Sequence, residues 1–96
     1  MGANAHIGFN EPGTPDDALA RRVRLAPSTA KVRTEGVTLG FRSLDHAARV
    51  VIAAKGVAKR EAIRRSFFEP PSLDVPASRL QRHRHVVVVL EREALP

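Results

Sequence analysis

Cysteine, tyrosine and tryptophan are all absent from this chain of 96 residues, and its aromatic content is limited to four phenylalanines. Without cysteine the chain forms neither a disulfide framework nor a thiolate metal site, and such a composition fits a reducing compartment. With so few aromatic rings it has little to stack on unpaired bases, which argues against a protein that binds single-stranded nucleic acid.

Long apolar segments are absent too. No run approaches about 18 residues, the length that a membrane-spanning helix needs, and the N-terminus lacks the basic-then-apolar order of a secretory signal. We therefore expect a soluble, cytoplasmic protein with no membrane partner. A length of 96 residues allows one domain at most, and 43% apolar residues is ordinary for a globular chain.

Acidic residues are fewer than basic ones, 10 against 16, which leaves a formal net charge of +6. Such a surplus indicates an anionic partner, which is a nucleic acid, a membrane surface or a phosphorylated metabolite. The Arg- and His-rich cluster at 79–85 contains no recognised nucleic-acid motif, so we interpret it as a solvated turn and expect no nucleic-acid partner. Its histidines lack a carboxylate or thiolate at ligand spacing, so we expect no metal site.

What the chain does contain is two short, continuously apolar segments, Val50–Ala54 and Val86–Leu90. An uninterrupted apolar strand is typical of a parallel sheet that is covered on both faces. Between them, residues 58–67 predict an amphipathic helix that ends before Pro70. Its predicted apolar face consists of Ala58, Ala62, Ile63, Ser66 and Phe67. Strand, helix and strand in this order form a βαβ unit with parallel strands.

The remaining predicted elements are short. They comprise extended segments at 23–26 and 37–39, a chain break at 34–36 and a polar helical turn at 78–83. Ser43 is expected to cap one further helical turn, and Ser28 or Thr29 another. Two strands of the buried type need more strands and helices to cover them than this chain supplies. We therefore predict an α/β fold that is the second half of a larger domain.

The most informative segment is residues 2–13, a run too rich in glycine to form a helix. It carries His6 and, five positions later, Glu11, whose side chains can converge on one point in a loop. Taken alone, such a pair is more often an ordinary feature of a loop than a site. The pattern around this pair favours a site.

That pattern, Gly-Ala-Asn-Ala-His-Ile-Gly-Phe-Asn-Glu-Pro-Gly, resembles the signature loop of the glucosamine-6-phosphate deaminases, also called glucosamine-6-phosphate isomerases. Residues 23–29 are similar to the strand and threonine that follow in the family, and residues 50–59 to its apolar strand, glycine and lysine. The family's closing Ser-x-Leu-Gln-x-His motif is matched by Ser78, Leu80, Gln81 and His83. The resemblance implies the truncated, C-terminal part of a Rossmann-like parallel-sheet domain, with 1–96 as one partial domain that lacks the family's N-terminal half.

The resemblance also implies a reaction, the conversion of glucosamine 6-phosphate to fructose 6-phosphate and ammonia in amino-sugar catabolism. His6 would open the sugar ring by taking a proton from one oxygen and giving one to another, a task that suits an imidazole near neutral pH. Glu11 and Asn4 would orient that imidazole, and Glu11 would stabilise its protonated form. Lys59, at the start of the predicted helix, would bind the substrate phosphate, although its position alone fits a solvated lysine better. No cofactor and no metal is implied.

Three departures from the family pattern bear on this interpretation. Ala5 stands where glycine is usual, so we predict a negative φ at this position. The family's phosphate-binding arginine has no clear equivalent, and Arg33 is a poor substitute. The N-terminal half would carry the aspartate that moves the sugar proton and a backbone loop that binds phosphate. We therefore expect this fragment to be impaired as an enzyme.

Other functions stay open. The chain is alternatively a truncated, non-catalytic remnant, or a subunit that works with a partner, either a second copy of itself or a complementary N-terminal half. The 6-phosphogluconolactonases share the fold and a related histidine loop, but residues 7–12 side with the deaminases. A basic nucleic-acid-binding protein is a further alternative, for which salt-dependent binding to duplex DNA would speak.

Overall fold

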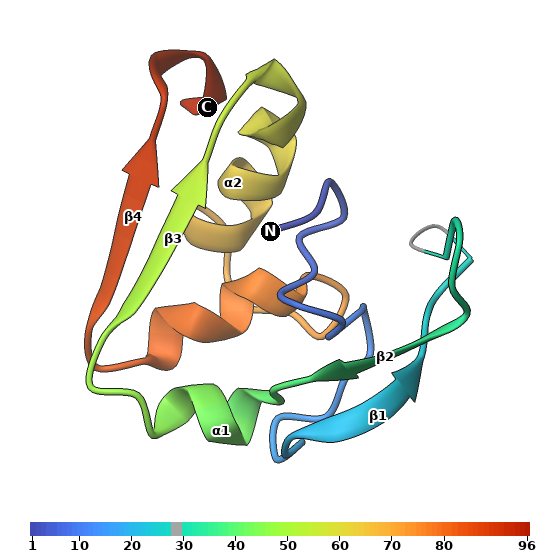
Figure 1. Cartoon of the computed structure of the whole chain (residues 1–96). Helices are drawn as coiled ribbons and strands as arrows, with labels where there is room; N and C mark the ends of the chain where they lie inside the picture. The colour runs from blue at the N-terminus through green and yellow to red at the C-terminus, as the bar shows by residue number, and fades with distance from the viewer. Residues whose placement is uncertain (28–29) are drawn as a thin grey trace.

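Figure 1 shows the computed structural model of the chain, which describes residues 1–27 and 30–96. Within this part of the chain, β1 (Arg21–Arg24) and β2 (Glu35–Thr38) form an antiparallel pair, and β3 (Val50–Ala54) and β4 (Val86–Leu90) a parallel pair. The helical elements are α1 (Phe41–Asp45), α2 (Arg60–Phe67) and the 3-10 segments η1 (Val57–Lys59), η2 (Pro76–Arg82) and η3 (Arg92–Ala94).

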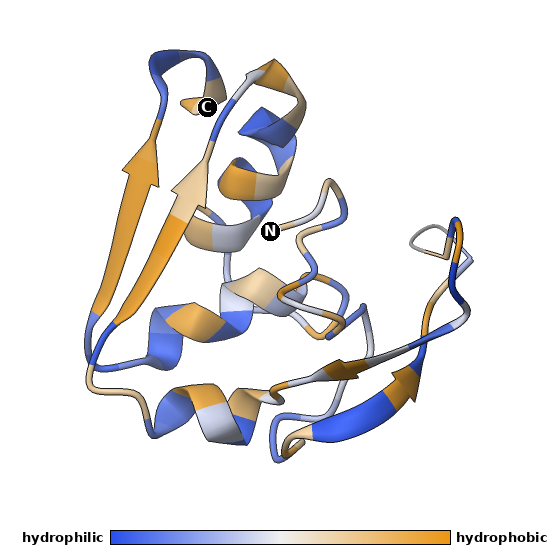
Figure 2. Ribbon diagram, in the orientation of Figure 1, coloured by the Kyte–Doolittle hydropathy of each residue, from blue (hydrophilic) through white to orange (hydrophobic). Residues whose placement is uncertain are grey.

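The two apolar strands β3 and β4 have the bounds that the sequence predicts. They pair in parallel, with Val50 opposite Val86 and Ala54 opposite Leu90, and α2 lies in the connection between them. Figure 2 shows that β4 and the start of β3 are the most hydrophobic stretch of the ribbon. The predicted α/β unit with a parallel strand pair is therefore confirmed.

One face of this sheet is covered and the other is open. Ile52 and Ala54 are 8% and 9% exposed, whereas Val51 and Val89, whose side chains point to the other face, are 57% and 54% exposed. Figure 1 shows α2 beside this strand pair. The described residues thus leave one face of the sheet open, as expected of a chain that supplies too few strands and helices to cover both faces. Side chains alternate between the two faces of a strand, and the helical elements of this part of the chain lie against one face only.

α2 forms the predicted amphipathic helix, preceded by the 3-10 turn η1. Its buried residues are Ala62, Ile63 and Ser66, and Phe67 is half-buried, so four of the five residues predicted for the apolar face are at least partly covered. Ala58 is exposed because it belongs to η1, whose side chains follow a different period. The helix face against the core is thus set by the spacing of the apolar residues.

The β1–β2 hairpin extends away from the rest of the molecule (Figure 1). Its strands begin two residues before the predicted extended segments 23–26 and 37–39. Glu35 and Gly36, predicted to break the chain, belong to β2, where Glu35 lies opposite Arg24. Pairing between strands, and not local preference, therefore decides the backbone conformation here.

The predicted helical turn at Ser43 is present, but α1 begins after Gly40 and Ser43 lies inside it. A Cβ atom at Gly40 would come within 2.0 Å of the carbonyl oxygen of Ala18, so close packing of two backbones places this start. The turn predicted at 78–83 is η2, and the cap predicted at Ser28 or Thr29 lies outside the described residues. None of the described helices combines the length and hydropathy needed to cross a membrane.

Candidate active site

The N-terminal loop folds into two consecutive turns. Two backbone hydrogen bonds of 3.0 Å close the first, over residues 2–6. Reciprocal backbone hydrogen bonds of 2.9 and 3.4 Å between Ile7 and Asn10 close the second. Gly8 in the second turn has a φ of +58°, which glycine adopts without the steric cost of a Cβ atom. Because each turn reverses the chain, the residues at their ends come together.

The three residues predicted to be catalytic meet where the two turns join. Asn4 Nδ2 donates a hydrogen bond of 2.8 Å to Glu11 Oε2, and Asn4 Oδ1 accepts one of 3.2 Å from the backbone N–H of His6. His6 Nδ1 lies 3.3 Å from Glu11 Oε1. The His6 and Glu11 side chains are 23% and 17% exposed, so the cluster is shielded but still open to a ligand. The structure therefore brings His6, Glu11 and Asn4 into one group.

The imidazole of His6 lies beside the Glu11 carboxylate without being aligned with it. Their 3.3 Å separation is within hydrogen-bonding distance, yet Nδ1 has no hydrogen bond of acceptable geometry and is shielded from solvent. Glu11 is engaged through its other oxygen with Asn4. Proton-transfer groups commonly come into alignment only when a ligand binds.

The His6 imidazole packs directly against Gly2. A Cβ atom at Gly2 would lie 2.4–2.7 Å from three atoms of the His6 ring. Any side chain at this position would therefore displace the ring. The glycine at the start of the loop is required by this contact.

The prediction of a negative φ at Ala5 is wrong, because its φ is +66°. A non-glycine residue in this left-handed conformation costs about 1–2 kcal/mol. The Ala5 side chain is 2% exposed and packs in a core cluster with Ala62, Val75 and Ala77. Its carbonyl also accepts a 3.0 Å hydrogen bond from Ala77 N. These contacts offset the strain and anchor the loop to α2 and η2.

Comparison with known proteins finds glucosamine-6-phosphate deaminases that align with nearly the whole chain. The chain is 40% identical over 105 aligned positions to the glucosamine-6-phosphate deaminase of Exiguobacterium sibiricum, and 40% identical to that of Enterococcus faecalis. It also superposes, with a TM-score of 0.91 and 33% identity over 98% of its length, on a solved monomeric glucosamine-6-phosphate deaminase. The chain belongs to the superfamily of glucosamine-6-phosphate deaminases and 6-phosphogluconolactonases.

The chain matches only part of these superfamily members. The comparisons cover 98% of it but 42% and 45% of the two deaminases, and 44% of the solved structure. A 6-phosphogluconolactonase from Leishmania guyanensis shares the fold, with a TM-score of 0.74 at 22% identity. No family model matches the chain. The chain therefore spans less than half of the length of the deaminases that it resembles.

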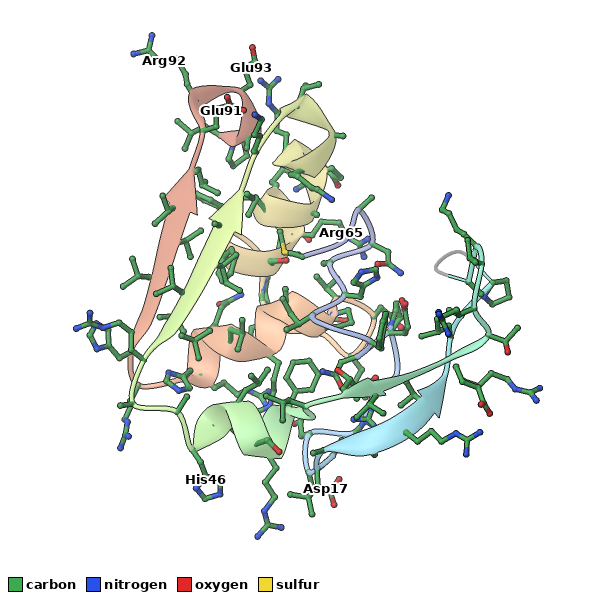
Figure 3. The ribbon with its side chains drawn as sticks, viewed as in Figure 1. Asp17, His46, Arg65, Glu91, Arg92 and Glu93 are labelled. Carbon is green, nitrogen blue, oxygen red and sulfur yellow. The ribbon has the colours of Figure 1, made fainter. Side chains whose placement is uncertain are left out.

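Lys59 lies apart from the histidine cluster, at the N-cap of α2. It is half-buried, and no contact of its side chain with His6, Glu11 or Asn4 is among those that the structure gives for residues 1–27 and 30–96. The turn in front of it already holds an anionic group, because Gly56 N donates a 2.9 Å hydrogen bond to the carboxylate of Glu91 (Figure 3). The turn before α2 thus has the geometry to receive a carboxylate-like oxygen.

The closing Ser-x-Leu-Gln-x-His motif has structural contacts. Ser78 is fully buried and its hydroxyl donates a 2.6 Å hydrogen bond to the carbonyl of Val75. Leu80 is 1% exposed. His83 Nε2 lies 2.9 Å from the carbonyl of Ala47, and His83 Nδ1 accepts a hydrogen bond from the backbone of His85. This part of the family pattern therefore holds η2 in place.

The interpretation of 79–85 as a solvated turn is wrong for its first residues. Arg79 is 17% exposed and pairs with two carboxylates, Asp16 at 3.1 Å and Asp45 at 2.7 Å. Arg82 also pairs with Asp16, at 3.3 Å. These arginines border a hollow of about 220 Å³ beside Ser72. Arg79 and Arg82 are thus paired with carboxylates within the protein.

Two buried polar residues beside the site were missed by the sequence analysis. Asn10 is fully buried and Thr38 is 7% exposed. Asn10 lies inside the glycine-rich loop, where a polar residue is ordinary, and its partner Leu39 lies 29 positions later, directly after Thr38. The only signal in the sequence is an apolar neighbour beside each polar residue: Phe9 precedes Asn10, and Val37 and Leu39 flank Thr38. Only the tertiary structure shows that both residues make hydrogen bonds that hold the same turn, residues 7–10.

Proposed function

We propose that this chain carries the sugar-ring-opening part of a glucosamine-6-phosphate deaminase site. The observation that supports the proposal is the cluster in which His6 Nδ1 lies 3.3 Å from the Glu11 carboxylate while Asn4 holds the other carboxylate oxygen at 2.8 Å. A histidine backed by a carboxylate and shielded from bulk water is the arrangement that general acid–base chemistry needs. The similarity to known deaminases supports glucosamine 6-phosphate as the substrate.

The proposed chemistry begins with the closed ring of glucosamine 6-phosphate. Ring opening takes a proton from the anomeric hydroxyl and gives a proton to the ring oxygen, so a single imidazole serves as base and then as acid. Glu11 stabilises the imidazolium that forms between these two steps. The complete reaction consumes one water molecule and yields fructose 6-phosphate and ammonia. The proposal includes no cofactor.

The phosphate of the substrate is assigned to the start of α2. Lys59 at the N-cap supplies a positive charge at the positive end of the helix dipole, and both attract a phosphate. Along the axis, Lys59 is about 10 Å from Ser66, because a helix rises about 1.5 Å per residue. Ser66 contacts Met1 of the N-terminal loop through its hydroxyl, at 3.8 Å. A phosphate near Lys59 and a sugar ring near His6 would therefore lie along one side of α2.

The proton transfer between two sugar carbons needs a further base. The chain spans 42–45% of the length of its deaminase relatives, and we propose that a complementary segment supplies this base and completes the site. Loss of a positioned acid or base reduces a rate about 10²- to 10⁴-fold. By itself the chain is expected to release little ammonia. Without the complementary segment it would therefore be the non-catalytic remnant that the sequence analysis gives as an alternative.

The test is an ammonia-release assay on the purified chain, with and without the N-terminal part of the Exiguobacterium sibiricum deaminase added as a separate polypeptide. We expect glucosamine-6-phosphate-dependent ammonia only with the added part, and a loss of at least about 10²-fold in the variant His6→Gln. The matched control is His46→Gln, since His46 is exposed at the end of α1. Equal rates for His6→Gln and the parent would contradict the assignment of His6.

A negative assay is resolved by calorimetry of the mixed polypeptides with glucosamine 6-phosphate. Binding without turnover would identify the chain as a substrate-binding remnant. Absence of both binding and turnover, with the two polypeptides shown to associate, would contradict the proposed function.

A further inference from the structure

The buried side-chain amide of Asn10 stabilises the turn between His6 and Glu11. Asn10 is 0% exposed, and its Nδ2 atom donates two hydrogen bonds, of 2.9 Å to Ile7 O and 2.7 Å to Leu39 O. Its Oδ1 atom accepts a hydrogen bond of 3.0 Å from Arg21. The amide therefore joins the turn to the start of β1 and to the end of β2.

A second buried group holds the same turn from the neighbouring residue. Thr38, the last residue of β2, is 7% exposed, and its hydroxyl accepts a 3.1 Å hydrogen bond from the backbone N–H of Phe9. The hydroxyl also touches the turn at Gly8, where an added Cβ atom would lie 2.6 Å from Oγ1. The Thr38 hydroxyl thus limits how closely Gly8 and Phe9 can approach the end of β2.

Both contacts act on the four residues that separate the histidine from the carboxylate. Residues 7–10 form a closed turn, His6 precedes it and Glu11 follows it. Displacement of this turn changes the positions of His6 and Glu11 relative to each other. Buried polar groups whose hydrogen bonds are all made favour one arrangement, because any other leaves donors and acceptors unpaired.

We infer that Asn10 and Thr38 are positioning residues for the candidate active site, and that they set the separation of His6 and Glu11. Neither is proposed to touch the substrate. Their role in catalysis rests on the proposed function, whereas their role in placing the imidazole rests on the structure alone. The alternative is that both residues only dock the hairpin and add stability without affecting the imidazole.

The imidazole has a spectroscopic signature that distinguishes these two roles. Its ring lies directly on Gly2, so the ring current of His6 shifts the resonances of the Gly2 α-protons. This shift, together with nuclear Overhauser contacts between the ring and Gly2, reports the ring position without any substrate. A residue that only stabilises the fold would leave both signals unchanged at temperatures below unfolding.

The experiment compares Asn10→Ala, Thr38→Val and the conservative variant Thr38→Ser by nuclear magnetic resonance. Thr38→Val keeps the size of the side chain but removes the acceptor for Phe9, whereas Thr38→Ser keeps the hydroxyl. We expect the first two variants to lose most of the Gly2 ring-current shift and the contacts to the ring, and Thr38→Ser to retain them. Unchanged resonances of β3 and β4 in each variant establish that the fold persists.

The inference is overturned if Thr38→Val unfolds at a lower temperature but keeps the Gly2 shift and contacts of the parent. This variant decides the question even if Asn10→Ala fails to fold. Loss of the ring signals in a chain that shows no ammonia release with the added deaminase part would support the positioning role while counting against the proposed function. The two failures are thereby distinguished.

Discussion

Gly2 lies against the face of the His6 imidazole, and Ala5 lies in the core three residues later. Gly2 is required because any Cβ atom there would collide with the ring. Ala5 is tolerated in a left-handed conformation because its methyl group is buried, which contributes about 0.8 kcal/mol, and because Ala77 hydrogen-bonds its carbonyl. Gly2 and Ala5 are therefore both small for different reasons, the first because of the imidazole and the second because of the core. The sequence pattern alone does not distinguish these reasons.

The substitution Gly2→Ala tests the contact between Gly2 and the imidazole. We expect it to displace the His6 ring from Glu11, to change the imidazole resonances and to abolish ammonia release in the complemented assay. The free energy of unfolding should change by less than about 1 kcal/mol, because Gly2 is only partly buried and has no unusual φ. The matched control is Ala3→Ser, at the exposed neighbouring position. Imidazole resonances that are identical in Gly2→Ala and the parent would contradict the contact.

At the scale of elements, α2 is closed at its C-terminus by a side chain from η2. Gln81 Nε2 donates hydrogen bonds of 2.8 and 2.7 Å to the carbonyl oxygens of Ser66 and Glu69. The last carbonyl groups of a helix have no partner within it, so a donor from another element replaces water there. On the exposed face of the same helix, Arg64 lowers the pKa of Glu61 through a side-chain hydrogen bond.

Gln81→Ala should loosen the end of α2. We expect a loss of about 1–2 kcal/mol in the free energy of unfolding, because two carbonyl groups lose their donor. Hydrogen exchange should accelerate at the amide of Phe68, which closes the helix on the carbonyl of Arg64. Arg64→Ala is the matched control, since it removes only exposed ion pairs and should leave the unfolding midpoint close to that of the parent. Equal effects of the two variants would contradict the capping role.

The sequence predicted the bounds of the apolar strands β3 and β4 better than those of the arginine-rich strand β1. β3 and β4 have the predicted bounds because their runs of apolar residues end abruptly at polar neighbours. β1 contains Arg21, Arg22 and Arg24, and its bounds depend on pairing with β2. A strand specified by a partner distant in the sequence leaves only a weak local pattern.

At the scale of the whole molecule, the open face of the β3–β4 sheet is an exposed apolar surface. Val51, Val87 and Val89 are 57%, 38% and 54% exposed on it. Parallel sheets are ordinarily covered on both faces. This face is therefore where the proposed complementary segment, or a second copy of the chain, would be expected to pack.

Val51→Thr and Val89→Thr test whether this face is open in solution. On an open face a hydroxyl stays hydrated, so we expect the free energy of unfolding to change by less than about 0.5 kcal/mol and the binding of a hydrophobic dye to fall. Ile52→Thr, on the covered face of the same strand, should cost about 2–3 kcal/mol, since a hydroxyl is buried and packing is lost. A comparable loss at Val51 would indicate a face that is covered by a second copy.

Local information in the chain specified the α/β class, β3, β4, α2 and the loop that carries His6 and Glu11. Each of these depends on residues close together in sequence, such as an apolar run, a helical period or a glycine-rich turn. The φ of Ala5, the pairing of Arg79 with Asp16 and Asp45, and the hydrogen bonds that join the turn at residues 7–10 to Thr38 and Leu39 became evident only in the folded chain. These features arise from contacts between distant segments, whose energies leave no periodic trace along the sequence.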